Sequence, residues 1–470
     1  MDETKPLKVV ESSHVSPPPG SVPTTSLPLT FLDLQWFPLP NVQRLFFYEF
    51  PYPTSHFMET ILPLLKQSLS LTLQQFFPFA ANVVCPPSPG KPYIRYEDGG
   101  SSVAFTVVES PSDFRCAIAD YPRDVKSLHP FAPELRTALS EAKDGTQVVL
   151  LPALAFQVTV FPNAGVCIGS SYCHVIGDGK AFMHFMKSWV DVYAAVGLEK
   201  SSLPLFNKDV IKDPIRVESF LLKMYHDWLS SLRENSGLTD VGSKVNMVRA
   251  TFVLSRADVE RLKQLVASQC MNEANSNQFH HVSTFVVTCA LTWASLIKSK
   301  ACVVNNLSYV DDADELYYLL FPFDCRNRLE FPVPSTYFGN CLKPGIVEMK
   351  KKELTGENGI VLAAKAIGSK VKEMGQSGIS GAENWLPSIA ERSKTGRLIS
   401  VAGSPKLRVY DTNFGWGKPR KVEVMHVESG QTISMAECRD EEGGIEVGVA
   451  LNKNQMDEFV AIFGQSLKLL

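Results

Sequence analysis

The chain has 470 residues and a formal net charge of −3, with 45% hydrophobic and 20% charged residues. This length exceeds the size at which one hydrophobic core usually stops growing, so two domains of roughly 200 residues each are expected. The near-neutral charge excludes a global field that would attract nucleic acid or an anionic membrane surface, and the composition is that of a globular protein.

The N-terminus starts Met1-Asp2-Glu3 and lacks the basic start and apolar core of a signal peptide. The longest uncharged stretch, 145–173, is interrupted by proline and glycine, so it predicts two buried strands rather than a membrane-spanning helix. The 10 cysteines contain no Cys-x-x-Cys pair, which favours a reducing compartment. We therefore expect a cytoplasmic protein without membrane contact.

Hydrophobic periodicity predicts the elements of the first half. A helix is expected near 55–75, with a kink at Pro63. The strands expected are 93–97 and 103–109, and a buried hairpin or neighbouring strands at 147–161 and 166–172. A helix with one apolar face over 180–196 then leads into a candidate linker over 197–213.

The second half opens with a strand at 248–254 and a helix for which Ser255 and Asp258 form a capping box. A strongly apolar helix over 284–298 follows, with Ser283 as its N-cap. Further strands are expected at 317–323, 407–410, 432–436 and 444–451. Separated helices and strands of this kind predict an α/β (mixed α+β) protein of two domains, which we place at 1–205 and 206–470.

The sharpest local motif is Ser-Tyr-Cys-His-Val-Ile-Gly-Asp-Gly at 171–179, which puts His174 between a buried strand and an amphipathic helix. At such a point a rigid scaffold meets an accessible loop. An imidazole takes up a proton near neutral pH, and a nearby carboxylate could fix its orientation. His174 is thus a candidate general base, although a His and an Asp four residues apart occur by chance in many chains.

Other chemistries have weaker support. A metal site with His174 and Asp178 has no evident third ligand, and the histidines at 280–281 are adjacent, which points their side chains apart. The stretch 375–378 is one residue short of a serine hydrolase elbow, and Cys173 faces the opposite side of its strand from His174. Phosphate-binding and dinucleotide-binding glycine patterns are absent from the sequence, and we expect no metal.

A second motif, 410–419, interleaves aromatic residues with glycine and predicts a tight loop with a structural rather than a catalytic role. Together, His-x-x-x-Asp-Gly and Phe-Gly-Trp-Gly at this separation resemble the plant BAHD acyltransferase family. The segments 27–33 and 65–73 extend the resemblance along the chain. Segment 337–341 resembles the mark of the branch that acylates anthocyanins and other flavonoid or phenolic glucosides.

The resemblance implies two domains, each like chloramphenicol acetyltransferase, with a channel at their interface. His174 would take a proton from a sugar hydroxyl as its oxygen attacks the thioester of acyl-CoA, a co-substrate rather than a permanently bound cofactor. Asp178 would be structural and paired with Arg326, and Gly179 would let the backbone clear the channel. The partners implied are small molecules only, acyl-CoA and a phenolic glucoside, bound by a monomer.

The resemblance also implies where coenzyme A binds. The contacts expected lie near Lys263, Ser283, Thr284, Gly403 and Ser404. Small residues and exposed N–H groups suit pantetheine and phosphate.

Two positions depart from the family pattern. Asn413 stands where relatives carry Asp, at the start of the motif completed by Gly415, Trp416 and Gly417. If the usual Asp meets a cation, the change would leave a weaker hydrogen bond with one charge less to bury, and we expect the enzyme to be active nonetheless. Ala81 replaces a usual Gly and should have little effect.

The choice of acyl donor depends on the residues after the motif histidine. Malonyl-using relatives can carry an arginine shortly after it, but this chain has none between His174 and Val196. It offers Phe182, which could pack on an aromatic acyl group, and this favours a hydroxycinnamoyl donor. The alternative that Phe182 is simply helix core stays open, and Arg44 and Lys180 remain candidate cations for a malonyl group.

The acceptor implied is a sugar hydroxyl of an anthocyanin or flavonoid glucoside. Two other classes of protein stay open at this point. One is a non-catalytic binder of acyl-CoA or phenolic glycosides, against which the intact His174 argues. The other is a hydrolase that uses water as the acceptor.

Overall fold

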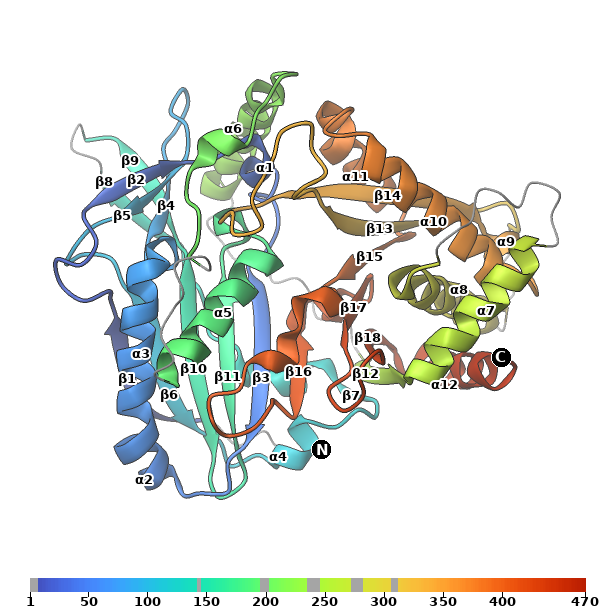
Figure 1. Ribbon diagram of the computed structural model, residues 1–470, viewed down its shortest axis with the longest axis horizontal. Helices are drawn as coiled ribbons and strands as arrows, with labels where there is room; N and C mark the ends of the chain where they lie inside the picture. The colour runs from blue at the N-terminus through green and yellow to red at the C-terminus, as the bar shows by residue number, and fades with distance from the viewer. Residues whose placement is uncertain (1–6, 142–144, 195–202, 235–245, 272–281, 306–311) are drawn as a thin grey trace.

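The computed structural model describes residues 7–141, 145–194, 203–234, 246–271, 282–305 and 312–470. Figure 1 shows two halves side by side, each built around one large sheet, with a smaller sheet on the first half. The fold is therefore of the mixed α/β class that the sequence predicts.

Three sheets contain all the named strands. The six-stranded sheet has the order β1 (Lys8–Val15), β6 (Val103–Glu109), β10 (Leu154–Phe161), β11 (Gly165–Tyr172), β3 (Val42–Glu49) and β16 (Lys421–Val424). The five-stranded sheet has the order β2 (Thr25–Pro28), β5 (Tyr93–Tyr96), β4 (Asn82–Cys85), β9 (Gln147–Pro152) and β8 (Ala138–Glu141). The seven-stranded sheet has the order β14 (Leu342–Lys350), β13 (Leu316–Asp324), β15 (Leu398–Ala402), β17 (Thr432–Glu437), β18 (Ile445–Asn452), β12 (Met247–Leu254) and β7 (Arg123–Asp124).

Helices cover these sheets. In the first half they are α1 (Phe31–Leu34), α2 (Thr54–His56), α3 (Leu62–Gln75), α4 (Phe114–Ala117) and α5 (Gly179–Tyr193). Later in the chain come α6 (Val217–Glu234), which lies beside α1 on the first half, and, on the second half, α7 (Arg256–Met271), α8 (Thr284–Asn305), α9 (Lys351–Thr355), α10 (Gly359–Gln376), α11 (Trp385–Ser393) and α12 (Lys453–Lys468). In Figure 1, α3 and α5 lie next to each other over the six-stranded sheet.

The strand that leads to the motif histidine is completely buried. β10 and β11 pair antiparallel from Leu154↔Tyr172 to Phe161↔Gly165, which confirms the predicted hairpin. β11 is buried along its whole length because α5 covers one face of its sheet and the segments that carry Phe114 and Phe131 pack on the other, so its sequence is nearly continuous in small and apolar residues rather than alternating. The predicted strand 147–161 is divided at Ala153, where the chain passes from the smaller sheet to the larger one.

Pro63 interrupts the first long helix as predicted. A π-helical turn, Phe57–Ile61, lies just before α3, and the N–H of Leu62 bonds to the carbonyl of Phe57. Proline lacks an N–H and is tolerated in the first turn of a helix, so the regular α-helix begins at this point.

The predicted caps of the second half are present. Ser255 Oγ accepts from the N–H of Asp258 at 3.1 Å, and Asp258 Oδ2 accepts from the N–H of Ser255 at 2.9 Å. Ser283 Oγ accepts from the N–H of Val286 at 3.3 Å at the start of α8. These contacts confirm the capping box and the N-cap, while α8 continues seven residues beyond the predicted end at 298, to Asn305.

One predicted strand is wrong. Residues 407–410 belong to two 3₁₀ turns, Pro405–Leu407 and Val409–Asp411, on either side of Arg408. Arg408 has φ 51° and ψ 58°, a left-handed conformation that cannot continue a strand. The helix predicted over 180–196 ends at Tyr193, and much of the predicted linker, 195–202, lies outside the described residues.

Each large sheet contains a strand from the opposite half of the chain. β16 pairs with β3, Val424 opposite Arg44, and β7 pairs with β12, Asp124 opposite Val248. The division at 205/206 therefore cuts across both large sheets and remains a prediction. By length and composition, Thr284–Val303 could cross a membrane, but 72% of its most apolar window is buried in the fold, which is typical of a core helix.

Candidate active site

His174 lies two residues beyond the end of β11, in the 3₁₀ turn His174–Ile176. The N–H of Cys173 bonds to the carbonyl of Ala153 at 2.9 Å, which fixes the segment after β11 to the residue between β9 and β10. The His174 side chain is half-buried, whereas the strand before it is buried. The buried strand β11 thus positions the His174 imidazole where it is partly accessible.

Asn340 determines which nitrogen of His174 carries the proton. Its Nδ2 donates to the carbonyl of His174 at 2.9 Å and to Asp33 Oδ1 at 3.0 Å, so its Oδ1 is left to face His174 Nδ1 at 3.1 Å. An amide oxygen only accepts, which requires the proton on Nδ1. The lone pair of His174 is therefore on Nε2, where a base needs it.

Asp33 supports Asn340 from behind. It is fully buried, and its Oδ1 also accepts from the N–H of Asn340 at 2.9 Å. Its Oδ2 accepts from the N–H of Thr30 at 2.9 Å and from Lys208 Nζ at 3.1 Å. The Lys208 side chain is only 3% exposed, so a buried ion pair anchors α1, Asn340 and the described part of the predicted linker to one another.

Asp178 is structural, and the expected pair with Arg326 is present. Arg326 Nη1 lies 2.7 Å from Asp178 Oδ2, and both side chains are buried. Asp178 also caps α5, because its Oδ1 accepts from the N–H groups of Lys180 and Ala181 at 3.1 and 3.0 Å. Its Oδ2 accepts from the N–H of Cys341 at 3.1 Å. The carboxylate is thus surrounded by donors from both halves of the chain.

The same contacts argue against the competing chemistries. Both oxygens of Asp178 are used by Arg326 and backbone N–H groups, which leaves a poor ligand for a metal. Among the described residues, no group of three or more His, Cys, Asp or Glu could hold a metal ion, and the pair at 280–281 lies outside them. Burial raises the pKa of Cys173 to about 11, so its thiol is a poor nucleophile.

Burial also lowers the pKa of His174 below its ordinary value of 6.5, against the opposing effects of Asp178, Asn340 and Asp33. A lowered pKa keeps the imidazole neutral at pH 7. The arrangement can therefore accept a proton from a bound hydroxyl.

The Phe-Gly-Trp-Gly loop packs at the far end of α5. Asn413 Oδ1 accepts from the N–H groups of Gly415 and Gly417, both at 2.9 Å. Both glycines have positive φ, 89° and 94°, which side-chain-bearing residues rarely adopt. Trp416 stands edge-on to Tyr48, at 5.6 Å between ring centroids, and edge-on to Tyr193.

This position fits the structural role expected for the loop. His174 lies before the first turn of α5 and Tyr193 is its last residue, so the 15-residue helix puts about 20 Å between them. Asn413 is exposed, and its side-chain oxygen binds backbone N–H groups. The partners of this position are therefore backbone N–H groups rather than the cation considered above.

The positions predicted to bind coenzyme A lie in the second half. Lys263, on α7, is paired with Glu260 at 2.8 Å, and Ser283 and Thr284 begin α8, which packs on α7. Gly403 follows β15 with φ 78°, and a Cβ there would lie 2.6 Å from the carbonyl oxygen of Met435. Ser404 Oγ accepts from the N–H of Lys406 at 3.2 Å. Each position has a local structural role, and its contact with coenzyme A stays a prediction.

Phe182 does not face an open space. It is fully buried and stacks on Tyr172 with 4.4 Å between ring centroids. A donor could not touch it without displacing Tyr172, so the structure favours the helix-core alternative and corrects its placement in a donor pocket. Gly179 starts α5, where a Cβ would lie 3.3 Å from Leu407, so its absence lets the helix approach this residue.

The two candidate cations differ in their surroundings. Arg44 is 4% exposed on β3, and its Nε is buried without a hydrogen-bond partner in the described part of the chain. Lys180 is more exposed and lies 3.5 Å from Asp324. Arg44 is thus the cation with unused donor capacity near Tyr172.

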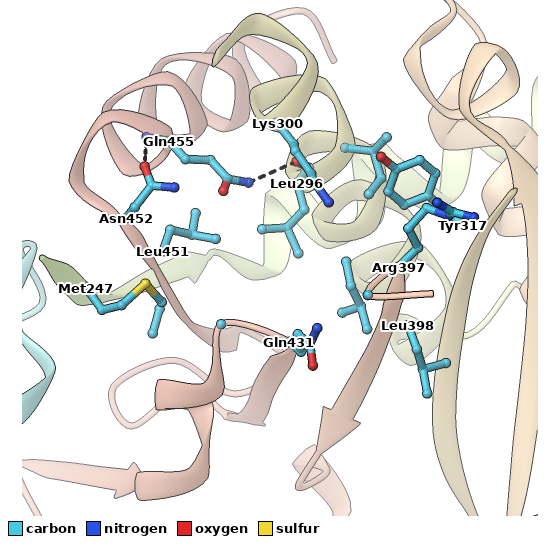
Figure 2. A pocket seen from close by; sticks show the side chains of 15 residues that line it. Met247, Leu296, Lys300, Tyr317, Arg397, Leu398, Gln431, Leu451, Asn452 and Gln455 are labelled. Atoms are coloured by element: carbon cyan, nitrogen blue, oxygen red, sulfur yellow. Dashed lines mark hydrogen bonds between the residues drawn. The ribbon is translucent and has the colours of Figure 1, made fainter. Parts of the chain in front are cut away.

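A cavity of about 280 Å³ lies elsewhere, between α8, α12 and the ends of β15 and β18 (Figure 2). Its lining includes Leu296, Tyr317, Arg397, Gln431 and Gln455. None of the 15 lining residues belongs to the site around His174, so this cavity is separate from the candidate active site.

Asn340, Asp33, Lys208 and Trp36 were not predicted as site residues. The first two lie in segments that carry the family resemblance, which was the one available signal. The bond between Asn340 and Asp33 joins positions 307 residues apart, and the bond between Asn340 and His174 joins positions 166 residues apart; local patterns do not encode such contacts.

The sequence pattern that defines the Transferase family matches residues 6–465. The chain belongs to this family, the BAHD acyltransferases. This BAHD acyltransferase is 41% identical over 474 residues to coumaroyl-CoA:anthocyanidin 3-O-glucoside-6''-O-coumaroyltransferase 1 of Arabidopsis thaliana, covering 99% of this chain and 98% of the relative. It is 36% identical to malonyl-coenzyme A:anthocyanin 3-O-glucoside-6''-O-malonyltransferase of Dahlia pinnata, covering 100% and 99%.

Solved structures show the same fold. Vinorine synthase superposes with a TM-score of 0.65 at 17% identity, covering 96% of each chain. TRI101 of F. graminearum, complexed with coenzyme A and T-2 mycotoxin, gives 0.65 at 15% identity, covering 93% of this chain and 97% of that one. The BAHD acyltransferase described here therefore has the two-domain, chloramphenicol-acetyltransferase-like fold of these proteins.

Proposed function

We propose that this enzyme transfers a hydroxycinnamoyl group from coenzyme A to a sugar hydroxyl of an anthocyanin or flavonoid glucoside, with His174 as the general base. The observation that carries the proposal is the half-buried imidazole whose Nδ1 is bonded to Asn340. The named activities of the 41% and 40% identical relatives support the donor and the acceptor.

The mechanism is direct transfer. His174 Nε2 takes the proton of the acceptor hydroxyl as its oxygen forms a bond to the thioester carbon. The tetrahedral oxyanion then collapses, the carbon–sulfur bond breaks, and the thiolate of coenzyme A takes the proton back from the imidazolium. General-base assistance of this kind is worth about 10²–10⁴-fold in rate. Asn340 keeps Nδ1 protonated throughout, so that Nε2 alone exchanges the proton.

A malonyl donor is the second candidate. The relatives that are 36% and 34% identical carry malonyltransferase names, and the unused donor of Arg44 would suit a carboxylate. The absence of arginine between His174 and Val196 supports the hydroxycinnamoyl donor instead. The enzyme would act as a cytoplasmic monomer, with acyl-CoA as a co-substrate and no permanently bound cofactor.

The test is a mass-spectrometric assay of purified protein with an anthocyanidin 3-glucoside and equal concentrations of coumaroyl-CoA and malonyl-CoA. A coumaroyl ester as the main product, absent with His174→Ala, is the expected result. A malonyl ester would keep the mechanism and overturn the donor. Free acid in place of ester would indicate a hydrolase, and binding without any His174-dependent product would indicate a non-catalytic binder.

A further inference from the structure

Trp36 stacks flat on the base. Its indole and the imidazole of His174 are 3.7 Å apart between centroids, with an angle of 1° between their planes. Trp36 follows α1, and its N–H bonds to the carbonyl of Asp33 at 3.2 Å. The same Asp33 carboxylate supports Asn340, so the ring that covers the imidazole and the amide that orients it are held by one rigid element.

Hydrogen bonding does not account for this placement. Trp36 Nε1 is buried and has no acceptor among the described residues. A buried N–H without an acceptor costs free energy, so the indole is held in this position although its N–H loses its hydrogen bond to water. The contact that remains is the π face of the indole against the imidazole.

The imidazole has to carry a positive charge for part of each catalytic cycle. Burial disfavours that charge and lowers the pKa of His174. The charged and titratable groups around the ring are Asp178 and Asp33, which favour the cation, and His426, which interacts with it across the site. Asp178 is already neutralised by Arg326, and Asp33 by Lys208. Little of their charge is left to stabilise an imidazolium.

An aromatic face can supply the missing stabilisation. A cation within about 6 Å of a ring centroid is attracted by the ring quadrupole, most strongly for tryptophan, and more so when the pair is desolvated. At 3.7 Å, and half-buried, the Trp36–His174 pair satisfies these conditions as soon as the imidazole is protonated.

We propose that Trp36 is a positioning residue of the reaction, which fixes the plane of the His174 imidazole and stabilises the imidazolium that forms when the acceptor hydroxyl is deprotonated. The catalytic consequence rests on the proposed function. The effect on the charged imidazole does not, because it concerns His174 alone.

The decisive experiment replaces Trp36 by mono-, di- and trifluorotryptophan through stop-codon suppression, which withdraws electrons from the ring without changing its shape. The pKa of His174 is read by NMR titration of histidine-labelled protein, with His174→Gln assigning the resonance. The pKa should fall with each fluorine, and Trp36→Leu should lower it by about one unit. Trp36→Phe should give a His174 pKa between those of the wild type and Trp36→Leu. Trp385→Phe, a control on α11, should leave the His174 pKa unchanged.

Turnover provides the second readout. If coumaroyl transfer is observed, kcat should fall with the same series, by about tenfold for Trp36→Leu, with KM for both substrates changed less than about twofold. A His174 pKa that is independent of fluorination, within roughly 0.3 units, would overturn the proposal whether or not the substrates are right. Fluorination does not alter the fold, so this outcome stays readable even if Trp36→Leu fails to fold.

Discussion

Among single residues, Asn340 has the most direct influence on the chemistry. Its amide is oriented by two acceptors, Asp33 Oδ1 and the carbonyl of His174, and only its oxygen can face Nδ1. Replacing it removes the group that fixes the tautomer while leaving the base in place. Two residues thus have distinct roles: Asn340 orients the imidazole, and His174 itself would accept the proton.

We predict that Asn340→Ala lowers kcat by about 10–100-fold, part of the 10²–10⁴-fold that general-base catalysis provides, because both tautomers of His174 become populated. The KM for acyl-CoA should change little. Steady-state kinetics with each substrate varied in turn measures both. A kcat within about twofold of the wild-type value would show that Asn340 does not control the tautomer.

We expect the residue at position 413 to affect stability rather than rate. An aspartate there would accept the same two N–H bonds from Gly415 and Gly417 as charge-assisted bonds, which are roughly twice as strong as neutral ones. We predict that Asn413→Asp raises the free energy of unfolding by about 0.5–1 kcal/mol, discounted for the exposure of this side chain. Urea unfolding measures this change, and a large gain in kcat at unchanged stability would argue against it.

At the scale of elements, Asp178 joins the start of α5 to the strands of the second half. Burial alone would raise its pKa, but Arg326 and the N–H groups of Ala181 and Cys341 outweigh burial and lower it below 3.8. A carboxyl whose folded-state pKa is depressed stabilises the fold above its unfolded-state pKa. That contribution is lost as the pH falls through the folded-state value.

We therefore predict that wild-type stability falls more steeply below about pH 4 than that of Asp178→Asn, by up to roughly 1.4 kcal/mol per pH unit. Asparagine is a good N-cap, so this variant keeps the helix start while removing the charge. Urea unfolding from neutral to acid pH checks the prediction, with Asp457→Asn on the exposed face of α12 as the control. Parallel curves for wild type and Asp178→Asn would refute it.

Elements also show where the sequence is informative. The helix caps at Ser255 and Ser283 and the β10–β11 hairpin were predictable because their signals are local. β14 was missed because Pro344 and Gly345 count against a strand, yet Pro344 is tolerated because β14 is at the edge of its sheet. β16 was missed because Lys421 and Glu423 are polar, although ion pairs accommodate both buried side chains.

The candidate site shows the same limit. His174 and Asp178 were predictable because four residues and a turn hold them together. Trp36 and Asn340 contact His174, and Asp33 contacts Asn340, only after the whole chain has folded, and single-sequence patterns do not carry that information. Phe182 was assigned to a donor pocket because an apolar helix face has the same sequence pattern whether it faces the core or a ligand.

At the scale of the whole molecule, the two halves exchange strands and share a buried ionic cluster. Glu423 of β16 is bonded to Arg123 of β7 and to Arg249 of β12, and all three side chains are at least nine-tenths buried. This cluster lies where β16, delivered by the second half, joins the sheet that carries His174. This carboxylate between two arginines therefore adds to the contacts of Asp178 and Asp33 that hold the two halves together.

We predict that Glu423→Ala destabilises the whole fold by about 3–5 kcal/mol, because the buried guanidinium of Arg123 loses its carboxylate partner and that of Arg249 keeps only Glu428, 3.7 Å away. The loss should appear as one cooperative shift in urea unfolding followed by both circular dichroism and tryptophan fluorescence. Glu442→Ala, at an exposed position, is the matched control. Separate transitions for the two probes would show that the halves unfold independently.

The most direct test of His174 Nε2 as the base is the single-turnover rate of ester formation as a function of pH for wild type and His174→Ala. We predict that the wild-type rate rises with pH and levels off below the ordinary histidine value of 6.5, since burial lowers the pKa of His174. His174→Ala should lose about 10²–10⁴-fold in rate together with that pH dependence, while acyl-CoA still binds. A His174→Ala enzyme with near-normal rate and an unchanged pH profile would contradict the account.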